Sequence, residues 1–171
     1  FTQVFDAFAE FEESLIKSRM ERIEDAAAAE QGSSDKDEVD LELGLARLED
    51  LMERRPVLLN SVLLRQNPHN VAEWHKRVEL HQSKGPREQI SIYMTAVTTV
   101  DPAKATGGRP SSLWIELARL YEKYNRLSDA RVVFEKAVAA NYVNVEDLAA
   151  VWAEWAELEV RHDNHTEALE V

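Results

Sequence analysis

SLWIELARLY, residues 112–121, contains the pattern that decides the fold of this chain. A large ring leads the segment at Trp114, and apolar side chains follow it at Leu117, Ala118, Leu120 and Tyr121. On an α-helix these positions form one broad face, and the small Ala lets a neighbouring helix cross closely. The segment therefore predicts an amphipathic helix that packs against other helices.

The same pattern recurs along the second half of the chain. Its aromatic leads are Trp74, Trp114 and Trp152, which lie 40 and 38 residues apart. This interval is the size of one helix-turn-helix unit in a helical repeat protein. Because such a unit cannot bury its own apolar face, it must stack on neighbours, and stacking produces a long surface instead of a catalytic pocket. The sequence predicts an all-α fold, an α-solenoid of stacked antiparallel helix pairs.

Composition narrows the function classes. The 171 residues are 44% hydrophobic and include no cysteine, so a sizeable core is available without disulfides or thiolate metal sites. No apolar run approaches the roughly 18 residues that cross a bilayer, and no secretory signal is visible. We therefore expect a soluble, intracellular protein with no membrane partner.

The formal net charge of −12 is concentrated in one region. Residues 21–53 hold 12 acidic and 3 basic residues, whereas residues 54–171 hold 16 and 15. The nearly neutral second region lacks the dense Lys/Arg surface that neutralises phosphates. Direct RNA binding by this chain is therefore not expected.

The N-terminal part divides into a helix and a loop. A helical stripe that starts near Phe5 predicts a helix over residues 1–30, which would belong to an incomplete N-terminal repeat unit. Residues 31–39 have almost nothing to bury and predict a flexible acidic loop, either a solvated linker or an acidic docking motif. Ser33 and Ser34 in this loop are candidates for phosphorylation.

The remaining residues, 40–171, are expected to form the solenoid, truncated at its C-terminus. Asp40 can cap its first helix, and Pro56 favours a break in that helix. Asn70 with Glu73 resembles a capping box before the Trp74 helix. Asn144 with Asp147 repeats this spacing before the Trp152 helix, and Lys84-Gly85-Pro86 predicts a tight turn between helices.

Aligning the units on their aromatic leads defines a set of repeat residues. In the second helix of one unit, Arg131 and Glu135 are spaced to pair at i, i+4. We expect the rings to lie in the core, with a peptide-binding or base-stacking groove as the alternative. The predicted repeat positions are Phe5, Phe8, Phe11, Glu12, Trp74, Trp114, Ala118, Tyr121, Arg131, Phe134, Glu135, Ala137, Trp152, Trp155, Ala156 and Glu159.

The aromatic-led pattern of the first helix and the pattern of the second helix together resemble the half-a-TPR repeat, called HAT, of RNA-processing scaffolds. One unit departs from the HAT pattern because Arg77 and His81 stand where an aromatic and a Glu are expected, and another has Tyr121 at the Glu position. The carboxylate role of the HAT pattern is therefore carried over only to Glu12 and Glu159.

A longer likeness runs through LLNSVLLRQNPHNVAEWHKRV, residues 58–78, and continues in AV at 96–97, VDP at 100–102 and KATG at 104–107. This run resembles the middle of the SYF-type pre-mRNA splicing factors, the family of the XPA-binding protein of animals, and the likeness covers most of residues 39–171. The resemblance implies a nuclear, non-enzymatic scaffold of the spliceosome.

The family's place in the spliceosome also follows from this resemblance. It implies membership of the Prp-nineteen-associated complex, contacts with the Aquarius helicase and with a Crooked-neck-type HAT protein, and transcription-coupled DNA repair as an additional role. Two alternatives stay open: a HAT scaffold of mRNA 3′-end processing, and a TPR-like clamp that binds a short peptide in a groove lined by Lys, Arg and Asn.

The residue pattern favours neither catalysis nor a bound cofactor. The pairs His75/His81 and His162/His165 are close in sequence, but a metal site needs three or four converging ligands, so we expect ordinary surface or turn histidines. Carboxylate pairs are read as solvated helix faces, and no phosphate loop or nucleophile elbow occurs. The expectation is a protein with no catalytic residues, no metal and no cofactor.

Overall fold

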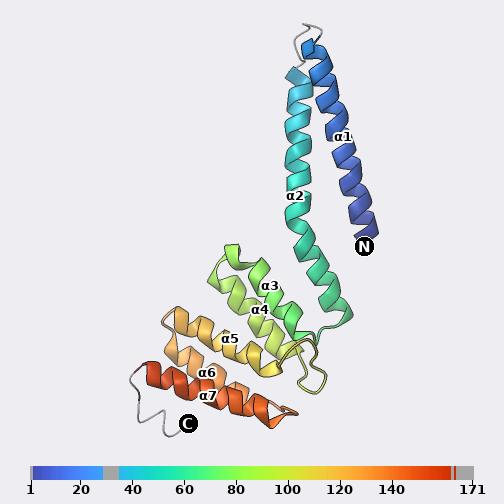
Figure 1. Ribbon diagram of the computed structural model, residues 1–171. Coiled ribbons are helices and arrows are strands. Elements are labelled where there is room, and N and C mark those ends of the chain that lie inside the picture. Colours follow the sequence, from blue (N-terminus) through green and yellow to red (C-terminus); the bar gives the residue numbers. More distant parts are fainter. Residues whose placement is uncertain (1, 29–34, 163, 165–171) are drawn as a thin grey trace. The chain divides into compact units, whose positions relative to one another are not determined.

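The computed structural model describes residues 2–28, 35–162 and 164 of the chain. The regular elements within these residues are helical, and an isolated β-bridge joins Asn70 to Thr106. The all-α prediction is confirmed (Figure 1). The elements in chain order are α1 (Thr2–Ala28), α2 (Asp35–Gln66), α3 (Val71–Leu80), the short 3₁₀ helix η1 (Gln82–Lys84), α4 (Pro86–Thr99), α5 (Pro110–Lys123), α6 (Leu127–Val138) and α7 (Val145–Arg161).

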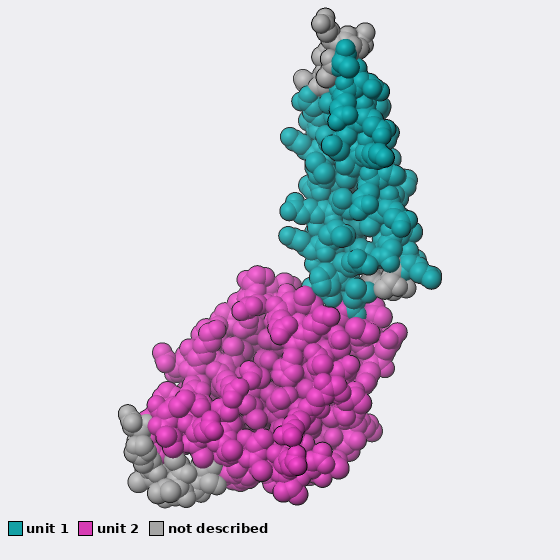
Figure 2. Space-filling model, viewed as in Figure 1, with its two compact units in different colours: residues 1–59 teal, residues 60–171 magenta. Residues whose placement is uncertain are grey.

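The chain forms two compact units, residues 1–59 and residues 60–171 (Figure 2). The boundary between them falls inside α2, after Leu59. This division differs from the predicted boundaries at residues 30 and 39, because α2 continues as one helix from Asp35 to Gln66.

Unit 1 is an antiparallel pair made by α1 and the first part of α2. Arg19 near the end of α1 donates a hydrogen bond to the backbone oxygen of Asp40, near the start of α2, over 2.8 Å. Asp6 near the start of α1 pairs with Arg55, farther along α2, at 2.6 Å. Gly44 permits the close approach, since a Cβ there would lie 3.2 Å from the Ile16 side chain.

Two expectations about α2 are wrong. Residues 35–39 form its first turns instead of a loop, because carboxylates are stabilised at a helix N-terminus. Asp37 in this turn also pairs with Arg22 of α1 at 3.2 Å. Pro56 lies inside the helix, where it is exposed, so water can bind the carbonyl that loses its N–H partner. Residues 31–34, with both candidate phosphorylation sites, lie outside the described residues.

Unit 2 stacks helices α3 to α7 so that each contacts the next along the chain, and α5 also contacts α3 and α7 (Figure 1). One continuous hydrophobic core runs through these contacts from Leu64 to Leu158. Its fully buried side chains include Leu117 and Ala118 of α5 and Phe134 of α6. Packing between nearest neighbours is the arrangement expected of a helical repeat.

Helix ends in unit 2 are partly as predicted. The Asn70 side chain accepts a hydrogen bond from the Glu73 amide at the start of α3, and Gly85, with φ of 94°, precedes Pro86 at the start of α4. The helix α7 begins after Asn144, as predicted, but the Asn144 side chain makes no capping hydrogen bond. Asp147 instead connects two helices. Its buried carboxylate accepts a 2.6 Å hydrogen bond from Ser111 and so ties the start of α7 to that of α5.

Candidate interaction surface

The aromatic leads of unit 2 lie at the margin of the core. Trp74 is 8% exposed and donates its indole N–H to the backbone oxygen of Pro68 over 2.8 Å. Trp114 and Trp155 are half-buried against the core, and the half-buried ring of Trp152 stacks on Trp155 with centroids 5.5 Å apart. The core interpretation holds for Trp74 and is incomplete for the other three, because Phe134 and aliphatic or small side chains fill the centre.

The repeat residues of unit 1 also include both buried and exposed side chains. Phe5 and Glu12 are buried, whereas Phe8 and Phe11 are 49% and 56% exposed. Placing Phe8 and Phe11 in the core is therefore wrong. The buried stripe instead follows residues 5, 12 and 16, and it includes Ile16, which the alignment with the other units does not single out.

Most of the remaining repeat positions take up packing roles. Ala118, Phe134 and Ala137 are fully buried, and Ala156 is half-buried. The ring of the half-buried Tyr121 lies under a guanidinium group, that of Arg126, at 5.0 Å from the ring centroid. These positions support the interfaces between neighbouring helices.

The carboxylate of Glu159 on α7 is buried and accepts hydrogen bonds from three other residues. Glu159 is 1% exposed, and its two carboxylate oxygens accept hydrogen bonds from Nε and Nη2 of Arg131, at 2.7 and 2.6 Å. The Trp155 indole and the Asn164 amide donate to it as well. Hydrogen bonds from Arg131 hold the pKa of Glu159 below its ordinary value. Arg131 thus meets α7, while its predicted partner Glu135 is exposed.

A second ion-pair cluster joins α5 to α7. Arg119 binds both carboxylate oxygens of Glu154, at 3.1 and 2.6 Å, and Arg161 binds Glu122 and Glu154. Burial acts to raise the pKa of Glu154, but hydrogen bonds from the two arginines bring it below its ordinary value. Hydrogen bonds from Arg161 likewise lower the pKa of Glu122. This cluster stabilises the repeat and has no features of an acid–base pair.

Of the two histidines on and next to α3 that are expected at the surface or in a turn, His81 lies in a turn but is buried, and His75 is half-buried within the helix. His81 is 5% exposed, and its Nδ1 bonds to the backbone oxygen of Arg77. His75 is half-buried and bridges three helices, with Nδ1 3.0 Å from the Tyr93 hydroxyl on α4 and Nε2 2.8 Å from the Ser112 hydroxyl on α5. Burial lowers the pKa of His75.

The direction of each bond around His75 follows from its neighbours. The Ser112 hydroxyl donates to the backbone oxygen of Arg109 over 2.7 Å, so it accepts from Nε2 of His75. That leaves Nδ1 as the acceptor for the Tyr93 hydroxyl and assigns a neutral imidazole. His75 is therefore a structural bridge between helices.

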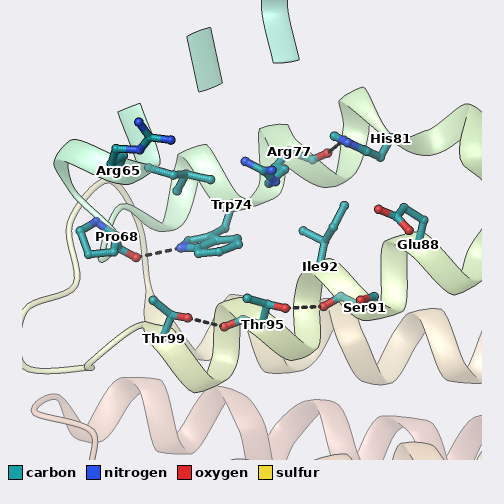
Figure 3. A pocket seen from close by; sticks show the side chains of 11 residues that line it. Arg65, Pro68, Trp74, Arg77, His81, Glu88, Ser91, Ile92, Thr95 and Thr99 are labelled. Carbon is teal, nitrogen blue, oxygen red and sulfur yellow. Dashed lines mark hydrogen bonds between the residues drawn. The ribbon is translucent and has the colours of Figure 1, made fainter. Parts of the chain in front are cut away.

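A pocket of about 460 Å³ lies between α3 and α4 (Figure 3). The buried side chains of Leu64, Trp74 and Ile92 supply its apolar part. The exposed Arg65 and the half-buried Arg77 contribute positive charge to its lining. The other polar lining residues are His81, Glu88, Ser91, Thr95 and Thr99.

Of this pocket, the repeat alignment singles out only Trp74. Arg77 is visible in the sequence as a departure from the HAT pattern, and this departure is the signal that could identify the wall of the pocket. The spacing of Ser91, Thr95 and Thr99 by four residues is a second signal, because it places three hydroxyls on one face of α4.

Two other kinds of site can be assessed over the described part of the chain. Residues 2–28, 35–162 and 164 contain no group of three or more His, Asp and Glu side chains that could hold a metal ion. Among those same residues, no helix is both long enough and apolar enough to span a bilayer.

Stacked helical hairpins with one continuous core define the chain as a helical repeat protein. Residues 1–100 match the family model of the pre-mRNA-splicing factor SYF1 middle HAT repeat. Residues 102–171 match that of the pre-mRNA-splicing factor Syf1/CRNKL1 C-terminal HAT repeat. The chain belongs to the SYF1 family of pre-mRNA-splicing factors.

Relatives from distant organisms support this assignment. The chain is 58% identical to the human pre-mRNA-splicing factor SYF1 over 169 residues, which is 99% of the chain and 19% of that protein. Identity is 54% over 171 residues to the Drosophila melanogaster syf1 homolog, across 100% of the chain and 19% of the relative. The chain is 40% identical to Schizosaccharomyces pombe cwf3 over 164 residues, which is 96% of the chain and 20% of that relative. The chain thus spans about a fifth of the length of these relatives.

Proposed function

We propose that this chain is a segment of a non-enzymatic protein–protein scaffold that acts in pre-mRNA splicing. The observation that carries the proposal is the unbroken family match, in which the middle and C-terminal HAT models together cover nearly the whole chain. The stacked helices of unit 2 suit this role, because packing between nearest neighbours holds successive surfaces at fixed spacing.

The finer assignment follows the family resemblance. The parent protein acts in the nucleus, within the Prp-nineteen-associated complex of the spliceosome, and contacts the Aquarius helicase and a Crooked-neck-type HAT protein. Transcription-coupled DNA repair is an additional role of the same parent protein. The partners dock helices or extended segments on the polar outer surfaces of the repeat, because its apolar faces are occupied by neighbouring helices.

Charge supports protein partners over nucleic acid. Residues 54–171 carry 15 basic and 16 acidic residues. Three arginines on α5, α6 and α7, namely Arg119, Arg131 and Arg161, already bind carboxylates of the same chain. The region therefore has a net charge of −1 and lacks the excess of cations on which tight RNA binding depends.

Affinity purification tests the scaffold role. The full-length parent protein, tagged at its own locus, is purified from nuclear extract, and the bound proteins are identified by mass spectrometry against an untagged control. We expect spliceosomal proteins, with the Aquarius helicase and a Crooked-neck-type protein among them. Recovery of mRNA 3′-end-processing factors in their place would support the alternative HAT scaffold, and recovery of neither group would refute both.

A further inference from the structure

The pocket between α3 and α4 contains positive charge that the described carboxylates do not balance. Neither Arg65 nor Arg77 forms an ion pair with a carboxylate in the described part of the chain, whereas the arginines that join α5, α6 and α7 do. Two guanidinium groups therefore contribute their charge to the pocket lining. Guanidinium groups bind carboxylates strongly because they can donate two parallel hydrogen bonds.

Neutral neighbours orient Arg77 within the pocket. Its guanidinium lies 3.2 Å from the Ser61 hydroxyl and 3.5 Å from the amide oxygen of Asn60. Glu73 lies one turn earlier on α3, but its carboxylate accepts a 2.9 Å hydrogen bond from the same Asn60 amide. Because the hydrogen-bond partners of the half-buried Arg77 are neutral, an anionic ligand could supply charge-assisted hydrogen bonds that these partners do not.

The α4 wall presents hydrogen-bond acceptors. The Thr95 hydroxyl donates to the backbone oxygen of Ser91 over 2.8 Å, and the Thr99 hydroxyl donates to that of Thr95 over 2.7 Å (Figure 3). Because both hydroxyl hydrogens are used within the helix, both oxygens can only accept further bonds. Backbone N–H groups of an extended peptide are suitable donors for such a wall.

The floor of the pocket suits one apolar side chain. Leu64, Trp74 and Ile92 are each more than nine-tenths buried and present only small apolar areas. The indole N–H of Trp74 is already bound to the backbone oxygen of Pro68, so it does not compete for polar ligand atoms. Glu88 lies at the opposite end of the pocket from Arg65 and disfavours an anion there (Figure 3).

We propose that this pocket binds an extended acidic segment of a partner protein. A carboxylate of the segment lies against Arg65 and Arg77, its backbone N–H groups meet the hydroxyls of α4, and an apolar side chain packs on Trp74. The proposal rests on the scaffold function and adds one docking site and the chemistry of its partner. RNA fits less well, because the Trp74 ring is only 8% exposed and cannot stack on a base.

Fluorescence anisotropy tests this proposal with the complete chain. The probes are short fluorescein-labelled peptides in which an Asp-Glu pair precedes a Leu, together with control peptides in which Asn-Gln replaces Asp-Glu. We expect the acidic peptides to bind and the amide controls to bind at least about tenfold more weakly. The double variant Arg65→Gln/Arg77→Gln should weaken binding of the acidic peptides by about tenfold or more, since it removes the charged donors.

Two matched controls separate binding from folding. Arg87→Gln removes one positive charge from α4 at an exposed residue outside the pocket lining and should leave affinity unchanged. Thr95→Trp fills the pocket from an exposed position and should abolish binding. Thr98 is likewise exposed and donates a hydrogen bond to a carbonyl of its own helix, but it lies outside the pocket lining. Thr98→Trp should therefore not abolish binding.

The proposal is overturned if the double variant binds the acidic peptides as tightly as Arg87→Gln, or if the amide controls bind equally well. It is also overturned if an oligouridine RNA binds more tightly than the peptides and loses affinity in the double variant, because the pocket would then be a phosphate site. Failure here leaves the co-purification result untouched, so the docking site and the scaffold role can be refuted separately.

Discussion

Residues 1–59 and residues 60–171 bury their apolar side chains to different degrees. In the first unit, Phe8, Phe11 and Leu45 are about half exposed although they lie on long, regular helices. In the second unit, a continuous core runs across five stacked helices, and Leu117 and Phe134 are completely buried. The difference teaches that a pair of helices buries apolar residues along the one seam between its members, whereas each helix of the stack has several neighbours.

Substitution of Phe134 should have the largest effect on stability. Phe134→Ala removes a fully buried ring between α6 and its neighbours and should lower the free energy of unfolding by about 3–5 kcal/mol. Phe11→Ala removes the same atoms from a ring that is 56% exposed and should cost less than about 0.5 kcal/mol. Urea unfolding followed by circular dichroism measures both, and equal losses would contradict the contrast between the two units.

Substitution of the buried Glu159 should have the next largest effect on stability. Glu159→Gln removes the negative charge and replaces one of the two oxygens that accept from Arg131 by an NH2 group, which should cost roughly 2 kcal/mol. Asp50→Asn in unit 1 breaks an exposed pair with Arg54 at 3.4 Å and should cost less than about 0.5 kcal/mol. If the two variants unfold at the same urea concentration, Glu159 does not hold α6 to α7 as described.

Acidification should weaken unit 2 through the same carboxylates. The pKa values of Glu122, Glu154 and Glu159 lie below the ordinary value of 4.5 in the folded chain, so the unfolded chain binds protons more readily. Their stabilising contribution is therefore present above about pH 4.5 and is lost as the pH falls through the lower folded values.

Urea midpoints measured across this pH range check the acid effect. The stability difference between the unmodified chain and Glu159→Gln should shrink as the pH falls below 4.5, because protonation removes the charge that the variant lacks. A difference that stays constant down to about pH 3 would show that the charge of Glu159 contributes nothing.

The smallest expected effect concerns the neutral histidine that joins α3, α4 and α5. The pKa of His75 should lie below the ordinary 6.5, so its contribution to stability is complete above pH 6.5 and falls as the pH drops toward the folded value. Tyr93→Phe removes the hydroxyl that donates to Nδ1 of the neutral ring, and this loss should raise the pKa of His75. An NMR titration of the imidazole measures both values, and an unchanged pKa in the variant would contradict the assigned bond direction.

Local sequence signals predict much of unit 2. Gly85 and Pro86 mark the turn before α4, and Asn70 marks the start of α3, because these residues act on the backbone within one turn. The continuity of α2 through Pro56 is not predictable in this way. A proline inside a helix costs about 3 kcal/mol, and only packing along the whole helix can offset that cost.

The repeat residues are predictable as a set, but their partners are not. The i, i+4 rule predicts a pair between Arg131 and Glu135, but it does not predict the bond that Arg131 of α6 makes to Glu159 of α7. The burial of His81 and the pocket charge of Arg77 likewise depend on contacts between segments distant in sequence. The family likeness predicts the HAT fold and the splicing context, and the α3–α4 pocket emerges only from the packed helices.

Hydrogen exchange of the complete chain, followed by mass spectrometry, tests most directly the claim that stacking between hairpins provides the stability of this scaffold segment. Amides of α5 and α6 should exchange slowest and together, and amides of α1 should exchange at least about tenfold faster, because fewer buried contacts protect them. Equal protection of α1 and α5 would contradict the claim, since the two-helix unit would then be as stable as the stacked array.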